Sequence, residues 1–171
     1  MTKDLSGGIL LGAIAGFIAT FPMTAAMRRL HLTLPDRERY PLPPREIAEG
    51  MPNLGAAPAR ATLLHHFLFG GAAGALFAAL FPRRDVAWGA AYGIAVWAGS
   101  YLGWIPAASI LRFGTSHPLR RNGLMLAAHV IWGACLAVCR HELEKAERDS
   151  FSLSASANPR LADRPVASAP H

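Results

Sequence analysis

Charged side chains are absent from four long stretches of this chain. The stretches are 17 to 26 residues long and comprise Leu5–Met27, Ala61–Phe81, Val86–Leu111 and Gly123–Cys139. All 17 basic and 11 acidic residues lie in the other half of the sequence. The hydrocarbon core of a bilayer is roughly 30 Å thick and needs about 20 apolar residues per helix, which three stretches meet and the fourth nearly meets. The pattern predicts an all-α integral membrane four-helix bundle.

The chain length limits the number of domains. Its 171 residues accommodate one bundle with loops but no separate soluble domain. We therefore expect a single four-span domain over residues 1–150, in which the last span continues as a solvated helix to about residue 150. The first apolar run exceeds the 7–15 residues typical of a signal peptide, so we expect it to be retained. Residues 151–171 are rich in Ser, Ala and Pro without periodicity, which predicts a disordered tail.

The first loop, Arg28–Arg60, is the largest hydrophilic segment between spans. Pro44 is suited to the first position of a helix, and Gly50 is suited to end one. The loop is therefore expected to hold a short helix and to form an ordered cap over the bundle. The first and third loops carry nine Lys and Arg, against six near the spans on the opposite face. This difference favours termini on the outer side of the membrane by the positive-inside rule.

Glycines recur at helical spacing within the spans, with bulky residues on the opposite side. Membrane helices associate where small residues let their backbones approach closely. The pattern predicts glycine-rich helix-packing faces whose partner is either another helix of this chain or a second copy. The predicted packing residues are Gly8, Gly12, Gly16, Gly70, Gly74, Gly99 and Gly103.

The third stretch contains two features that shape a helix. Pro106 lies near its end and predicts a kink. Trp97, Tyr101 and Trp104 follow one another at spacings of four and three residues, on one helix face. Aromatic residues are common near lipid headgroups, so we expect this stripe to face lipid or the interface rather than to form a ligand platform.

Histidines provide the sharpest local signal. Five of the seven lie on the side of the membrane shared by the first and third loops. In the last span, Asn122, His129 and Arg140 share one helical stripe, which predicts that His129 faces the interior, and His66 lies near the packing face of the second span. The candidate ionisable or ligand residues are His66, His129, Asn122, Arg140, His65, His117 and His31.

Three interpretations of this histidine cluster compete. The imidazoles can be neutral and serve packing through hydrogen bonds. They can titrate near pH 6.5 and make the protein proton-responsive or conductive to a small solute or ion. They can also ligate haem or a metal, although the chain has no HExxH or CxxC motif. We predict no cofactor, with haem or metal as the alternative.

Other classes of function have little support. The spans contain no acids, which excludes paired carboxylate catalysis within the membrane and argues against a small proton-coupled exporter. The basic residues are scattered among acids rather than clustered, so we expect no nucleic-acid partner. Cys135 and Cys139 lie on one face of the last span and predict no disulfide framework. The balance favours a protein that is not an enzyme.

Several short segments resemble the YagU-like family of small bacterial inner-membrane proteins. The matching pieces are the Gly-rich first helix followed by Pro41-Leu42-Pro43-Pro44-Arg45, a second helix led by His66 and ending at Phe81-Pro82, and His129-Val130-Ile131-Trp132 before a basic end near Arg140. The resemblance implies a multi-pass bacterial inner-membrane protein of four helices and transfers no catalytic residue. We thus expect a structural or accessory protein whose partners are the lipid bilayer and a second copy or a membrane complex.

Overall fold

The computed structural model describes residues 2–39, 41–42, 45, 59–81, 85–107 and 117–157. No strand occurs among these residues, which confirms the predicted all-α class. The long elements are α1 (Thr2–Leu32), α3 (Ala59–Leu80), α4 (Val86–Ala98) and α6 (Leu119–Ala157). The short ones are η1 (Asp36–Glu38), the π-helical η2 (Gly99–Trp104) and α5 (Ile105–Ala107).

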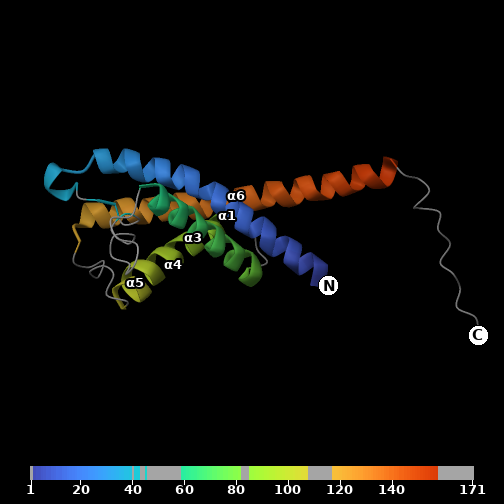
Figure 1. Cartoon of the computed structure of the whole chain (residues 1–171), viewed down its shortest axis with the longest axis horizontal. Helices are drawn as coiled ribbons and strands as arrows, with labels where there is room; N and C mark the ends of the chain where they lie inside the picture. The colour runs from blue at the N-terminus through green and yellow to red at the C-terminus, as the bar shows by residue number, and fades with distance from the viewer. Residues whose placement is uncertain are drawn as a thin grey trace, which may run out of the picture.

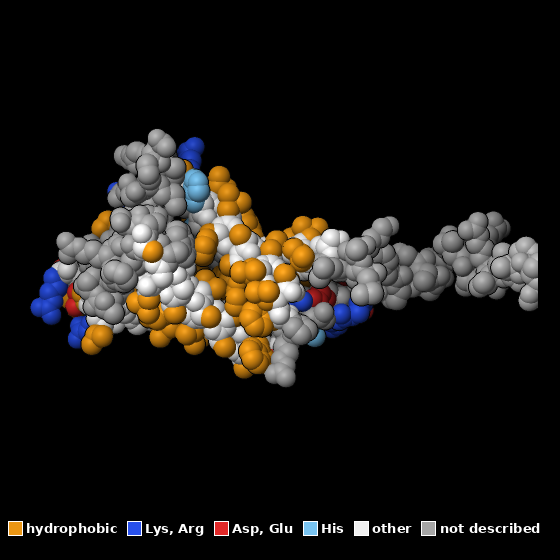
Figure 2. All heavy atoms as spheres, turned by 90° about the horizontal axis from the view of Figure 1, so that it is seen from below, with side chains coloured by type: hydrophobic (Ala, Val, Ile, Leu, Met, Phe, Trp, Pro, Cys, Tyr) orange, Lys and Arg blue, Asp and Glu red, His pale blue; other side chains and the backbone are white. Residues whose placement is uncertain are grey.

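Three of these helices are long and apolar enough to cross a membrane. Their candidate spans are Ser6–Leu32, Arg60–Leu80 and Leu119–Ser150. Leu10 and Leu80 expose about three fifths of their surface, and Figure 2 shows apolar side chains covering the middle of the molecule with charged ones toward its ends. An exposed apolar surface of this kind is costly in water and suits lipid. The helices therefore suggest a membrane protein.

The third charge-free stretch departs from the predicted continuous helix. Regular α-helix ends at Ala98, and Gly103 has non-helical backbone angles of φ −110° and ψ −107°. Pro106 lacks an N–H, so the carbonyl of Leu102 loses its usual partner four residues later. The kink expected near Pro106 therefore falls at Gly103, and residues 108–116 lie outside the described part of the chain. This stretch is not one of the three long apolar helices.

Two of the long helices pack against α6, and the third packs against α1. This helix lies against both α1 and α4, and α1 also lies against α3 (Figure 1). The buried core includes Phe77 and Leu136, each fully buried, and Trp132, which donates its indole N–H to the carbonyl of Gly16 at 3.2 Å. Beyond the bundle, α6 projects alone toward the C-terminus (Figure 1). It continues past the expected boundary at residue 150 to Ala157.

Two glycine seams hold the helices together. In the first, a Cβ added at Gly12 or Gly16 would come within 3.0 Å of the backbone of Gly74. A Cβ added at Gly70 would come within the same distance of the side-chain hydroxyl of Thr20. Such distances are shorter than real side chains allow, so only glycine permits this approach of α1 to α3. Four predicted packing glycines thus meet a helix of the same chain.

The second seam joins α4 to α6. A Cβ at Gly133 would come within 3.0 Å of the carbonyl of Gly89, and one at Gly93 would do the same at the carbonyl of His129. The other predicted packing residues behave differently. A Cβ would meet no atom within 4 Å at Gly8, Gly99 or Gly103. Gly99 and Gly103 belong to the π-helical segment, whose wider turns change the faces that a regular helix would present.

Two predictions fall largely outside the described residues. The short helix expected in the first loop began at Pro44 and ended at Gly50, and of this region the structure describes only Arg45, which is helical. The predicted disordered tail covered 151–171, of which 151–157 are the end of α6. Residues 158–171 lie outside the described ranges.

Candidate functional site

His66 of α3 and His129 of α6 lie on different helices, and their rings are within range of an electrostatic interaction. The sequence places both histidines on one side of the membrane and predicts that each lies near an interior face of its helix. Both side chains are partly buried. They are two ionisable side chains that belong to different candidate spans.

The hydrogen bond made by His129 fixes which ring nitrogen is protonated. Its Nδ1 lies 2.8 Å from the carbonyl of Met125, one turn earlier in α6. A carbonyl oxygen only accepts, so Nδ1 carries the hydrogen and donates it. In the neutral ring, Nε2 then keeps a free lone pair. His129 can therefore accept a proton or a hydrogen bond at Nε2 without losing its anchor on the helix.

His66 presents a nitrogen with unused hydrogen-bonding capacity. Its Nε2 is buried and has no hydrogen-bond partner among the described residues. Two other buried groups also have no hydrogen-bond partner among the described residues. They are the hydroxyl of Thr62, one turn earlier in α3, and the indole N–H of Trp97 in α4. Buried polar atoms are normally hydrogen-bonded, and exceptions often mark a function or a water molecule. These atoms give α3 and α4 buried polar groups with unused hydrogen-bonding capacity.

The aromatic stripe of the third stretch faces inward, which corrects the expectation that it faces lipid. Tyr101 is only 5% exposed, and Trp97 packs against the core. Their rings stack with centroids 6.2 Å apart, and the Tyr101 ring lies 5.6 Å from that of His117. The π-helical turns after Ala98 take more residues than α-helical ones, so Tyr101 rotates away from its expected position. The side chain of Trp104 is not among those that the structure describes.

The remaining candidate residues lie apart from the His66 and His129 pair. His65 is exposed and donates Nδ1–H to the carbonyl of Ala61 at 2.7 Å. Asn122 lies at the start of α6, where its amide is 3.5 Å from the carbonyl of His117. His31 is partly buried at the end of α1. Asn122 and His31 thus lie at helix ends, and His65 is distinguished from its neighbour His66 by its exposure.

Arg140 forms a buried ion pair, although the sequence suggested a solvated helical extension. Arg140 is 3% and Glu144 is 6% exposed, and the guanidinium Nε donates to the Glu144 carboxylate at 2.9 Å. The guanidinium also donates to the carbonyl of Phe81 at 3.1 Å and lies over the ring of Phe77, 5.6 Å from its centroid. The end of α3 covers the ion pair. The i, i+4 spacing predicts the pair but not this covering.

Arg121 was missed as a candidate. It is fully buried at the start of α6, and its guanidinium donates to the carbonyl of Pro41 in the first loop. The residue thus ties the first loop to the last helix. Its neighbour Arg120 is exposed, and no spacing rule separates these two adjacent arginines.

No metal-ligand cluster occurs in the part of the chain that the structure describes, where no three His, Cys, Asp or Glu side chains converge. Comparisons with known proteins add no assignment. No protein-family model, curated protein or solved structure matches the chain.

Proposed function

We propose that this chain is a four-span protein of a bacterial inner membrane with a structural or accessory role. The observation that carries this proposal is the exposed apolar surface between two charged ends (Figure 2), on a bundle whose helices are locked by glycine seams. A rigid, closely packed bundle suits a scaffold better than a wide aqueous channel. The inner-membrane location rests on the resemblance to the YagU-like family.

The fourth span is proposed for α4 together with η2 and α5. These elements carry no charged residue between Val86 and Ala107. In addition, α4 lies against the membrane-length helix α6 along the second glycine seam. Irregular backbone is tolerated at membrane depth where it is buried in protein, and Tyr101 of η2 is buried. Four spans would return both termini to one side of the membrane.

A topology experiment tests this proposal on the full chain. Membranes from expressing cells are washed with alkaline carbonate, and reporters sensitive to the compartment are fused to each terminus. We expect the protein to stay in the membrane pellet and both reporters to lie on the outer side of the inner membrane. Reporters on opposite sides of the membrane would mean that only three helices cross it. Recovery as a monodisperse protein without detergent would refute the membrane assignment.

Self-association is part of the proposal, but it cannot rely on the first glycine seam. Gly12 and Gly16 already contact α3 within the chain. A second copy would therefore use the outer surface of the bundle. Cross-linking of the protein in native membranes tests this point. A purely monomeric pattern would exclude self-association and leave an accessory role with a different partner protein.

A proton-responsive function is the second candidate, and the His66 and His129 pair favours it. Histidines are the only side chains of the four charge-free stretches whose ordinary pKa lies between 5 and 8. Protonation of both rings would place two like charges close together inside the bundle. Because such charges repel in a medium of low dielectric constant, protonation would disfavour the closed arrangement of the bundle.

Replacing His129 by alanine tests the proton-responsive function. In proteoliposomes, we expect H129A to abolish proton flux or the change in tryptophan fluorescence between pH 5 and 8. His65→Ala is the matched control, because His65 makes the same Nδ1 hydrogen bond to a carbonyl but is exposed. An unchanged response in H129A, or an equal loss in H65A, would remove the pair from any such mechanism.

A further inference from the structure

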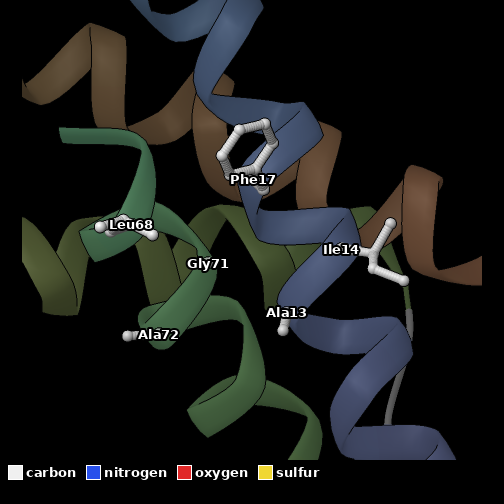
Figure 3. Close-up of a pocket in the computed structure, with 6 residues that line it drawn as sticks. All are labelled: Ala13, Ile14, Phe17, Leu68, Gly71 and Ala72. Carbon is white, nitrogen blue, oxygen red and sulfur yellow. The ribbon is translucent and has the colours of Figure 1, made fainter. Parts of the chain in front are cut away.

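A shallow apolar groove lies between α1 and α3 on the outer surface of the bundle (Figure 3). Its volume is ≈ 370 Å³, within the range of about 300–1,000 Å³ that is usual for ligand pockets. Small side chains leave space between bulky ones along both helices. The lining residues are Ala13, Ile14 and Phe17 from α1, and Leu68, Gly71 and Ala72 from α3.

The two faces that form the groove continue toward the loop end of the bundle. Phe21 of α1 lies one turn after Phe17, and Phe67 of α3 lies one turn before Gly71, with ring centroids 4.5 Å apart. The helices are antiparallel, so seven further residues along α1 and seven back along α3 lead to Arg28 and Arg60. Seven residues are about two helical turns, which keeps each arginine on the same face as its phenylalanine.

Both arginines are available to a ligand. Arg28 and Arg60 are exposed, and neither makes an ion pair within the described residues. Arg60 lies eleven residues before Gly71, which corresponds to about 16 Å along the helix. That distance is comparable to half the thickness of a bilayer core. The groove and the two charges therefore match the length of one lipid chain and the position of its headgroup.

We propose that this surface binds an anionic phospholipid. One acyl chain lies in the groove, and the headgroup phosphate lies between the guanidinium groups of Arg28 and Arg60. Guanidinium forks match phosphate oxygens in shape and charge, and basic sites between membrane helices are known to select anionic lipids. A choline headgroup adds a cation beside two arginines and is disfavoured. The proposal rests on the membrane assignment made above.

Native mass spectrometry of the full chain in detergent tests the headgroup site. The protein is mixed with equal amounts of phosphatidylglycerol and phosphatidylcholine of the same acyl composition. We expect wild type to retain phosphatidylglycerol roughly tenfold more than phosphatidylcholine, a preference that falls to near one in R28Q/R60Q. Arg120→Gln is the matched control, since it removes an exposed arginine at the start of α6, away from the groove.

A second pair of variants tests the acyl-chain site. Ala72→Phe fills the groove and should reduce retention of phosphatidylglycerol severalfold, whereas Ala91→Phe adds the same bulk to an exposed position of α4 and should not. Equal retention of the two lipids by wild type would overturn the proposal, as would an equal loss in R120Q. Failure of the membrane assignment would be seen separately, as protein that stays soluble without detergent.

Discussion

Gly133→Leu is expected to prevent the bundle from closing. A Cβ at this position would come within 3.0 Å of the carbonyl oxygen and carbon of Gly89. Both atoms are backbone, so no side chain can rotate away, and α4 must separate from α6. Overpacking typically costs about 1–3 kcal/mol where neighbouring side chains can adjust, and we expect the upper end of that range or more here.

Gly123→Leu is the matched control for this prediction. Gly123 lies on the same helix, and a Cβ there meets no atom within 4 Å. Since leucine favours helix more than glycine does, this control should be neutral or slightly stabilising. Size-exclusion chromatography and thermal unfolding in detergent compare the two variants. Equal behaviour of G133L and G123L would mean that α4 and α6 do not meet at this seam.

Arg140→Met is expected to destabilise the protein by about 3–5 kcal/mol, which is the usual cost of removing one partner of a buried ion pair. The variant removes the donor at 2.9 Å from the Glu144 carboxylate and the donor to the carbonyl of Phe81. Thermal unfolding in detergent measures the loss. Arg148→Met, an exposed change on the same helix, should stay within about 0.5 kcal/mol of wild type.

The double variant R140M/E144M separates charge from packing. Replacing a whole buried ion pair by apolar residues of similar volume is often neutral. We therefore expect the double variant to be more stable than R140M alone. If it is equally unstable, the loss in R140M comes from the Phe77 and Phe81 contacts rather than from an uncompensated carboxylate. If R140M itself matches R148M, the buried pair contributes nothing.

The sequence predicted the helices and the use of glycine, but not which glycines meet. Spacing along one helix shows that Gly12 and Gly16 share a face. It carries no information on the register between two helices, so the contact with Gly74 required the fold. The same limit explains Gly8, which continues the spacing but lies beyond the point where α1 meets α3 closely.

Helix faces predict that His66 and His129 lie near the interior, and both side chains are partly buried. Their joint role stays a prediction. The position of Tyr101 was not predictable, because π-helical turns change the face on which a residue lies. The burial of Arg140 was also hidden, since the covering residue, Phe77, is far away in the sequence.

Helix α6 is unbroken from Leu119 to Ala157, a length of about 58 Å at 1.5 Å per residue. The helix packs against α1 and α4 and is buried as far as Glu144, while its C-terminal end projects from the bundle (Figure 1). An uninterrupted helix resists twisting and bending over such a length. A rotation or tilt imposed on the projecting end would therefore also move the part of α6 that carries His129.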